Sequence, residues 1–379
     1  MKFLCLILLL LLSGCAPQEY ASTVPPTTTA PVVTTEPPAI PPETIPPDPI
    51  REMLDQMSLE QRVGQLFLAR CDDAYALEHI EKYHLGGFVL FGRDFQNQTP
   101  DSFREKLRDY QAAAKIPLLI AVDEEGGSVC RVSSNSSFRN RKFSSPRKLY
   151  SSGGMEAVLS EENEKCALLK SLGINANLAP VVDMATEGTA FMYDRSLGQN
   201  AAITSDFAAS AVTIMDSYAL GSCLKHFPGY GNNPDTHTGM ALDSRSLSQL
   251  EENDLLPFAA GISAGADAIL VSHTILECFD PEMPASLSPA IHRYLRETMG
   301  FTGVIVTDDL VMQAITDAYG AGEAAVLAVL AGNDLLCSTE YVVQYEAVLA
   351  AVLEGRISID LLNDAVRRVL QWKIDLGLI

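Results

Sequence analysis

From about residue 50 onward, short apolar runs rich in β-branched residues alternate with longer stretches that carry helical periodicity. This alternation predicts βα units and a parallel sheet. The candidate strands number eight, at residues 63–68, 87–91, 117–122, 176–182, 221–225, 266–271, 303–307 and 334–337. Eight strands with helices between them, over roughly 330 residues, predict an α/β fold with a single TIM-type (β/α)8 barrel domain. A doubly wound open sheet is the alternative that such a count leaves open.

Serine residues mark the predicted starts of several helices, and they are Ser58, Ser246, Ser288 and Ser358. The first two are each followed three residues later by a glutamine, which is the spacing of a capping box. Ser288 precedes a proline, which favours the first position of a helix. Ser358 begins a final amphipathic stretch in which apolar residues recur at helical spacing.

Residues 1–15 have the pattern of an export signal, with a basic Lys2, an apolar run and small residues before Cys15. The run is too short to span a bilayer. The stretch Leu12-Ser13-Gly14-Cys15 resembles a bacterial lipobox, which implies cleavage before Cys15 and a lipid on its sulfur. We therefore expect an exported protein anchored to the outer, extracellular face of the bacterial membrane. An ordinary secretory signal with an incidental cysteine is the alternative.

Residues 16–49 carry eleven of the 21 prolines, together with many threonines and almost no large apolar side chains. Such a segment cannot bury a core, so it is predicted to be a disordered linker. The predicted organisation is therefore a signal at 1–15, a linker at 16–49 and a catalytic domain at 50–379.

The charge of the chain argues against nucleic acid as a partner, because 48 acidic residues outnumber 27 basic ones and the net charge is −21. Besides Cys5 and Cys15, six cysteines are scattered along the chain without any CxxC pair. We expect most of them to be buried thiols. Neither a metal site nor a redox cofactor is predicted.

Ionisable residues follow five of the predicted strands, which is where barrel enzymes place their active sites. They are Asp123-Glu124-Glu125, Asp183, Lys225-His226, His273 and Asp308-Asp309. A lone example could be a loop charge or a helix cap. Five such strand ends together favour an active site at the open end of the barrel, because burying several charges at one place costs free energy without a function.

The densest polar segment is KHFPGYGNNPDTH at residues 225–237. Its glycines and prolines predict a loop. In extended chain Asp235 and His237 would face the same side, so the carboxylate could orient the imidazole and raise its pKa. Such a pair suits general acid/base catalysis. The alternative is a turn in which Asp235 binds backbone amides and His237 only packs.

Five ordered motifs carry a resemblance to a known family: VDEEGGSVCR at 122–131, NLAPVVD at 177–183, DRSLG at 194–198, KHFPGYGNNPDTH and VIVTDDLVM at 304–312. Together they resemble glycoside hydrolase family 3, and the D-x-H element resembles its β-N-acetylhexosaminidase branch. The resemblance covers residues 50–379. It implies that Asp308 is the nucleophile and that His237, assisted by Asp235, is the acid/base. The residues implied to hold the sugar are Asp123, Arg131, Arg195, Lys225 and His226.

The resemblance implies a retaining exo-β-N-acetylhexosaminidase that needs no cofactor and acts on N-acetyl-β-glucosaminides such as cell-wall fragments. We assume that the protein is a monomer. A phosphorylase with the same nucleophile and a non-catalytic sugar-binding lipoprotein are the alternatives. Two features depart from the family pattern. Tyr230 stands where many relatives have histidine, in a loop one residue shorter, and Ser128 stands where arginine is frequent.

Overall fold

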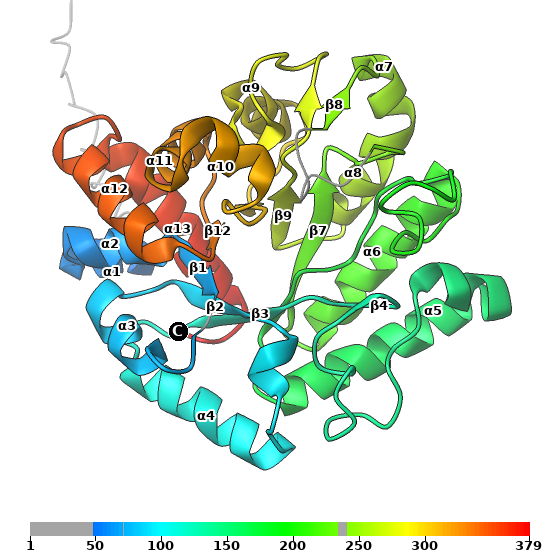
Figure 1. Cartoon of the computed structure of the whole chain (residues 1–379), viewed down its shortest axis with the longest axis horizontal. Coiled ribbons are helices and arrows are strands. Elements are labelled where there is room, and N and C mark those ends of the chain that lie inside the picture. The colour runs from blue at the N-terminus through cyan, green and yellow to red at the C-terminus, as the bar shows by residue number, and fades with distance from the viewer. Residues whose placement is uncertain (1–47, 71, 234–240) are drawn as a thin grey trace, which may run out of the picture. The chain divides into compact units, whose positions relative to one another are not determined.

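The computed structural model describes residues 48–379 apart from residue 71 and residues 234–240. At its centre lies a sheet of eight parallel strands in the order β11-β9-β7-β6-β3-β2-β1-β12 (Figure 1). The strands are β1 (Phe67–Arg70), β2 (Gly87–Leu90), β3 (Leu119–Val122), β6 (Ala176–Asn177), β7 (Gly221–Phe227), β9 (Ala268–Val271), β11 (Val304–Thr307) and β12 (Leu336–Ser338).

The two end strands of this sheet come together, which nearly closes it into a barrel. Val306 and Leu335 form an isolated parallel bridge, and the amide of Thr307 donates to the carbonyl of Leu335 at 3.1 Å. The predicted (β/α)8 barrel is therefore confirmed. Two small ribbons stand outside it: β4 (Glu124–Gly126) with β5 (Val129–Cys130), and β8 (Leu242–Asp243) with β10 (Ile275–Leu276).

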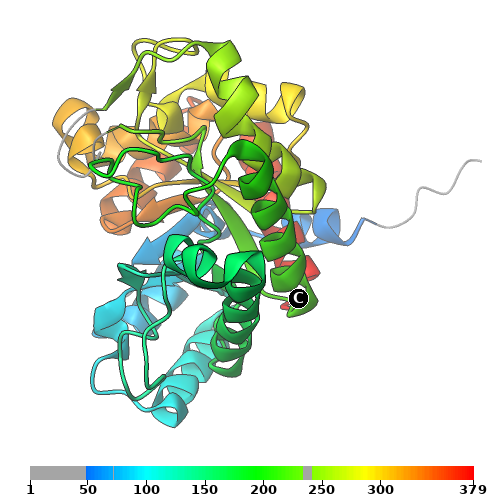
Figure 2. The ribbon, with the colours of Figure 1, turned by 90° about the vertical axis from the view of Figure 1, so that its right-hand side faces the viewer.

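Helices surround the strands (Figure 1), and α5 and α6 pack side by side along the outside of the barrel (Figure 2). The α-helices are α1 (Pro49–Gln56), α2 (Leu59–Gln65), α3 (Ala76–Tyr83), α4 (Pro100–Ala113), α5 (Pro146–Ser171), α6 (Ala201–Ser217), α7 (Leu247–Gln249), α8 (Leu255–Ser263), α9 (Pro289–Arg293), α10 (Gln313–Tyr319), α11 (Ala321–Ala331), α12 (Tyr341–Leu353) and α13 (Ile359–Asp375). Shorter 3₁₀ and π turns are η1 (Gly92–Phe95), η3 (Leu250–Asp254), η4 (Ala285–Leu287) and η5 (Tyr294–Thr298).

Alternate strand residues separate the barrel interior from the layer under the helices. Along β11, Val304 and Val306 belong to the interior cluster, whereas Ile305 packs in the outer one. The strands and their immediate neighbours supply the interior with Leu68, Val89, Leu119, Ala121, Ala176, Leu178, Cys223, Ala268, Leu270, Val304, Val306, Leu335 and Cys337. This filled interior is what the two-residue period of a strand produces when a sheet closes on itself.

The first predicted strand begins too early, because residues 59–65 form helix α2 and β1 starts only at Phe67. The capping box of Ser58 and Gln61 is present and starts this helix, so local capping overrides the β-branched pattern at Val63. The fourth predicted strand is also shorter than expected, since β6 has two residues.

Three of the four predicted serine caps are confirmed: the hydroxyl oxygens of Ser58, Ser246 and Ser358 accept a backbone N–H in the first turn. Ser288 occupies the N-cap position of α9 but makes no capping bond. Its hydroxyl instead donates to Asp280 Oδ2 at 2.7 Å, so a tertiary partner has replaced the local one.

Within the part of the chain that the structure describes, no helix combines the length and apolarity needed to cross a membrane. Residues 1–47, with Cys15, lie outside that part. Four of the five described cysteines are buried free thiols, namely Cys130, Cys166, Cys223 and Cys337, and Cys278 is half-buried. Burial raises the pKa of Cys223 to about 12, so this thiol is chemically inert at neutral pH.

Candidate active site

A cavity of about 710 Å³ opens at the carboxyl ends of the barrel strands. Six of the residues predicted to act on a substrate line it, from five different parts of the chain: Asp123, Arg131, Arg195, Lys225, His226 and Asp308. The other two predicted residues, Asp235 and His237, lie outside the described residues. The structure therefore brings together every described member of the predicted site.

Lys225 is the centre of the polar cluster on one wall of this cavity. Its ammonium lies 2.7 Å from Asp123 Oδ1 and 2.6 Å from Glu125 Oε1, and the side chain is buried. Burial alone would lower the pKa of Lys225, but the two carboxylates outweigh it and raise that pKa. Lys225 is thus held as a cation at neutral pH.

Arg195 meets Glu125 in a two-pronged ion pair, with Nε to Oε2 at 2.8 Å and Nη2 to Oε1 at 2.6 Å. Burial of Glu125 would raise its pKa, yet Arg195 and Lys225 hold that pKa well below its usual value. Glu125 was only one member of an acidic run in the sequence, and its role as the shared partner of both cations was not predicted. Three adjacent acidic residues give no sign of which one faces inward.

His226 is oriented by Asp183, which follows the fourth predicted strand. Asp183 Oδ2 accepts from the His226 Nδ1–H at 2.8 Å and from its backbone amide at 3.1 Å. With the proton on Nδ1, Nε2 accepts from Arg195 Nη2 at 3.2 Å. Tyr230 packs edge-on against this imidazole at 5.5 Å, and its amide donates to Asp183 Oδ1. The tyrosine that departs from the family pattern thus supports His226.

Arg131 reaches the cavity from the ribbon of β4 and β5. Its backbone amide and that of Val132 donate to Glu124 Oε2 at 2.8 and 2.7 Å, so the fully buried Glu124 fixes the backbone that carries it. The guanidinium lies 3.4 Å from Asp123 and 5.1 Å from the centre of the Phe91 ring. Glu124 therefore acts on the backbone and not on the cavity.

Asp308 follows β11 directly, is half-buried, and accepts the amide of Asp309 at 2.9 Å. Asp309 has a different role, since its carboxylate accepts the hydroxyl of Thr339 at 2.6 Å and two backbone amides. His273, which also follows a strand, is fully buried and contacts the carbonyl of Asp309 at 3.1 Å and Ser286 at 2.7 Å. His273 therefore contacts the backbone next to Asp308 and does not line the cavity.

The loop that carries Asp235 and His237 is held at both of its described ends by Arg245. This side chain donates to the carbonyl of Gly229 at 2.8 Å and pairs with Asp243, while its Nη1 lies 2.8 Å from Asp254. Gly229 has φ +114°, and a Cβ there would lie 2.7 Å from Asp254, so only glycine fits. The start and the end of the loop are therefore fixed.

Comparisons with known proteins agree with this geometry. The family model of the glycosyl hydrolase family 3 N terminal domain matches residues 58–372. The chain belongs to glycosyl hydrolase family 3. It is therefore a glycoside hydrolase.

Three family 3 relatives illustrate the similarity. The Beta-hexosaminidase of Xanthomonas campestris pv. campestris is 34% identical over 301 residues, which is 76% of this chain and 87% of that protein. A beta-N-acetylglucosaminidase from Paenibacillus sp. str. FPU-7 superposes with TM-score 0.79 at 32% identity, and the match covers 85% of this chain but only 63% of that one. A family 3 member from Mycobacterium smegmatis gives TM-score 0.77 at 27% identity, over 84% of this chain and 98% of that one.

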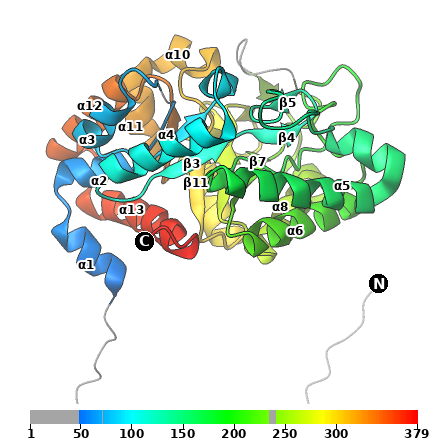
Figure 3. The same ribbon diagram turned by 90° about the horizontal axis from the view of Figure 1, so that it is seen from below.

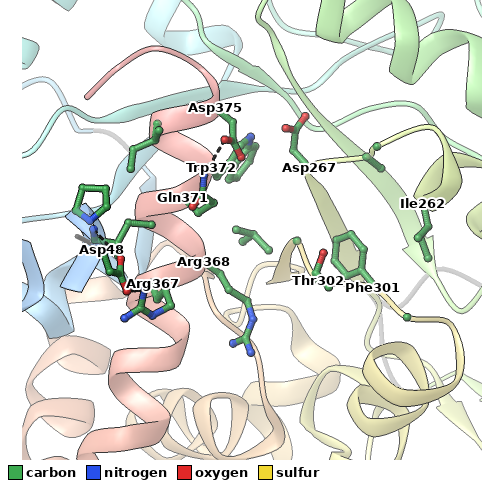
Figure 4. Close-up of a pocket in the computed structure, with 18 residues that line it drawn as sticks. Asp48, Ile262, Asp267, Phe301, Thr302, Arg367, Arg368, Gln371, Trp372 and Asp375 are labelled. Atoms are coloured by element: carbon green, nitrogen blue, oxygen red, sulfur yellow. Dashed lines mark hydrogen bonds and ion pairs between the residues drawn. The ribbon is translucent and has the colours of Figure 1, made fainter. Parts of the chain in front are cut away.

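A second cavity, of about 600 Å³, lies at the opposite end of the barrel between α13 and the starts of β9 and β11 (Figure 4). Figure 3 shows α13 and α1 at the end away from β4, β5 and α10. The arginines of this cavity are already paired, Arg367 with Asp48 at 2.7 Å and Arg368 with Asp334 at 3.0 Å. Because these arginines are already paired within the protein, we do not assign the active site to this second cavity.

Proposed function

We propose that this glycoside hydrolase is a retaining exo-β-N-acetylglucosaminidase, which removes terminal β-linked N-acetylglucosamine without a metal or organic cofactor. The observation that carries the proposal is the position of Asp308. It follows β11 at the carboxyl end of the barrel and lines the same cavity as Asp123, Arg131, Arg195, Lys225 and His226. The names of two similar proteins, a beta-hexosaminidase and a beta-N-acetylglucosaminidase, support the choice of sugar.

In the proposed mechanism, the Asp308 carboxylate attacks the anomeric carbon while His237, oriented by Asp235, protonates the departing oxygen. His237 then takes a proton from water, which cleaves the glycosyl ester and restores Asp308. Two inversions retain the configuration. Lys225 is buried and Arg195 is partly buried, and both cations have fixed partners, so their remaining N–H groups can hold sugar hydroxyls without reorganisation during the reaction.

We further propose that the enzyme is exported and held on the outer face of the bacterial membrane by a lipid on Cys15. The lipobox-like sequence and the proline-rich segment after it support this location. In that position the enzyme would act on cell-wall fragments or on external amino-sugar glycans.

The nucleophile is tested with the variant Asp308→Ala on p-nitrophenyl N-acetyl-β-glucosaminide. We expect turnover to fall by several orders of magnitude, because alanine at this position cannot form the glycosyl ester. The matched control is Asp317→Ala, an exposed carboxylate on α10 that should leave turnover within about twofold. Near-normal activity of Asp308→Ala would falsify the nucleophile assignment. Release of sugar 1-phosphate in phosphate buffer, instead of free sugar, would indicate a phosphorylase.

The anchor is tested with Cys15→Ala in the full-length precursor. We expect the variant to appear in the soluble fraction of cells or in the medium, because it cannot receive the lipid. Cys278→Ala, a change at a half-buried cysteine of the barrel domain, is the control and should remain with the membrane. A Cys15→Ala protein that still sediments with membranes contradicts the lipid anchor.

A further inference from the structure

The chain at the end of strand β9 holds the dipeptide Asp308-Asp309 at two points. In the parallel pair of β9 and β11, Val271 lies opposite Thr307, so the residues that follow these strands continue side by side. The backbone amide of Asp308 donates to the carbonyl of Val271 at 3.1 Å. Two residues further along, Nε2 of His273 lies 3.1 Å from the carbonyl of Asp309. The dipeptide is therefore held on both sides of the peptide bond that joins its two residues.

The position of the proton on His273 follows from the groups that its ring contacts. A carbonyl can only accept, so Nε2 carries the proton and donates to Asp309. In the neutral imidazole Nδ1 then has a lone pair, which accepts the hydroxyl of Ser286 at 2.7 Å. Both side chains are fully buried. His273 is thus held in one tautomer and one orientation, with its donor directed at a single backbone carbonyl.

Ser286 is itself fixed by hydrogen bonds to two other segments. Its amide donates to the carbonyl of Ser272 at 3.0 Å, and its carbonyl accepts the side-chain amide of Asn333 at 2.7 Å. The same amide nitrogen of Asn333 donates to the carbonyl of Ala328 at 2.7 Å, and the asparagine is buried just before β12. The partner of His273 therefore has little freedom to move.

The carboxylate of Asp308 depends on the orientation of the peptide that follows it, because the amide of Asp309 donates to Asp308 Oδ1 at 2.9 Å. The carbonyl of Asp309 is fixed by His273, and its carboxylate accepts the hydroxyl of Thr339 at 2.6 Å. Release of the carbonyl would let this peptide turn and would carry the carboxylate of Asp308 with it. A displacement of about 1 Å can slow a reaction by roughly 100-fold.

We propose that His273 is a positioning residue for the nucleophile: by donating to the carbonyl of Asp309, it holds the Asp308 carboxylate in line for attack. The inference rests on the proposed role of Asp308 and adds to it a residue outside the cavity. Because His273 does not line the cavity, its loss should lower kcat and leave KM nearly unchanged. A histidine that only filled the core would affect stability and leave the turnover of the folded enzyme as it is.

The test compares three variants of His273 on p-nitrophenyl N-acetyl-β-glucosaminide. We expect His273→Ala to lower kcat by about 30- to 100-fold, with KM within about threefold of wild type. Glutamine can place an N–H near the position of Nε2, whereas the shorter asparagine reaches only the position of Nδ1. His273→Gln should therefore exceed His273→Ala by about tenfold in kcat, and His273→Asn should resemble the alanine variant.

The leaving group gives a second readout. A displaced nucleophile slows formation of the glycosyl ester whatever group departs. The loss of kcat/KM in His273→Ala should thus agree within about threefold between p-nitrophenyl and methyl glycosides. A variant that disturbs the proton donor would lose more on the methyl glycoside.

His292→Ala is the matched control for the loss of a buried ring. His292 lies on α9, is buried, and contacts the carbonyl of Ser288 at 2.8 Å through Nδ1. This variant should lose stability in urea denaturation, as His273→Ala does, and keep the kcat of the folded enzyme within about twofold of wild type.

A milder variant covers the case in which His273→Ala does not fold. Ser286→Ala removes the hydroxyl that orients the imidazole and keeps the backbone bonds of Ser286. We expect it to fold and to lower kcat by about three- to tenfold, with KM unchanged.

A folded His273→Ala with near-normal kcat overturns the inference, as does a rise in KM at unchanged kcat. Equal recovery by glutamine and asparagine, or an equal loss of kcat in His292→Ala, also overturns it. If the wild type does not cleave N-acetyl-β-glucosaminides, the proposed sugar specificity fails. In that case a crystal structure of His273→Ala still tests the inference: we expect the carbonyl of Asp309 and the carboxylate of Asp308 to be displaced, and unchanged positions overturn it.

Discussion

Glu125 is the carboxylate that two cations of the active-site cavity share. It is shared by Lys225 and Arg195, at 2.6 Å from each, and its own side chain is almost fully buried. Asp123 gives Lys225 a second partner, but among the described residues Arg195 forms an ion pair with no carboxylate other than Glu125. The single carboxylate of Glu125 therefore neutralises the charge of Arg195 and shares with Asp123 the neutralisation of Lys225.

We predict that Glu125→Gln lowers the free energy of unfolding by about 3 kcal/mol or more, because it leaves buried positive charge uncompensated. Urea denaturation at pH 7 measures this loss. Glu156→Gln, an exposed change on α5, is the control and should stay within about 0.5 kcal/mol of wild type.

The pH dependence of that difference follows from the lowered pKa of Glu125. A carboxyl whose pKa is lower in the folded state stabilises the fold above its unfolded pKa, near ~4.3, and loses this contribution as the pH falls toward the folded value. The gap between wild type and Glu125→Gln should thus stay constant from pH 7 to pH 5 and shrink only under more acidic conditions. If the difference in unfolding free energy between wild type and Glu125→Gln disappears already at pH 6, the ion pairs of Glu125 with Lys225 and Arg195 do not lower its pKa as stated.

At the scale of elements, the loop after β7 matters most for the proposed chemistry, because it carries Asp235 and His237. Its first half is fixed by Gly229 and by Asn232, whose side-chain oxygen accepts the amide of Thr186 at 3.0 Å. Its second half is fixed at Asp243, which accepts from Asn233 at 2.8 Å. Arg245 joins the two halves, so it is a positioning residue for the loop that carries Asp235 and His237.

We predict that Arg245→Lys lowers kcat by about 10- to 100-fold while KM changes by less than about threefold, because a small displacement of the proposed acid slows the chemical step. The loss should be larger on substrates with poor leaving groups than on activated aryl glycosides, which need little protonation. Steady-state kinetics on both kinds of substrate provide the measurement.

The control for this prediction is Arg356→Lys, which changes an exposed ion pair with Glu323. It should leave both kinetic constants unchanged, since exposed pairs contribute little. An equal loss for Arg245→Lys on good and poor leaving groups would show that this arginine affects something other than the proton donor.

At the scale of the whole molecule, the barrel is closed by contacts between its first and last segments. Lys373 on α13 is fully buried and donates to Gln65 Oε1 at 2.6 Å, across 308 positions of sequence. Gln65 in turn donates to the carbonyl of His84 at 2.8 Å. Burial lowers the pKa of Lys373 to about 7.

We predict that the stability of the wild type rises with pH above 7 through Lys373. Its folded pKa lies below the unfolded value of ~10.4, so the unfolded chain binds more protons between these limits and unfolding becomes harder as the pH rises. In Lys373→Met this contribution is absent. The difference in unfolding free energy, wild type minus variant, should therefore grow by roughly 1 kcal/mol per unit from pH 7.5 to 9.

Urea denaturation of both proteins at several pH values measures this slope. Lys115→Met, at an exposed lysine, serves as the control and should give a difference from wild type that does not change with pH. A flat difference for Lys373→Met as well would mean that the buried lysine keeps its proton in the folded state up to pH 9.

The local pattern of the sequence determined the eight strands, most of the helix caps and the strand-end residues of the cavity, because strand period, capping and strand ends are read over a few neighbouring positions. Arg131 and Arg195 follow no predicted strand and were implied only by the family resemblance. Where two local signals competed, as in residues 59–65, the capping box prevailed and the predicted first strand was wrong at its start. The catalytic and substrate-binding roles of all the predicted site residues, and the lipid on Cys15, stay predictions.

Only the tertiary structure decided which charges meet. Glu125 and Arg195 are 70 positions apart, and their pairing depends on how strands from distant parts of the chain stagger around the barrel. The same holds for Arg70, which ends an apolar strand in the sequence, whereas in the fold it lines the cavity with its guanidinium 4.3 Å from the centre of the Phe91 ring. A side chain's partner is set by the register and tilt of other strands, and no pattern within its own segment contains that information.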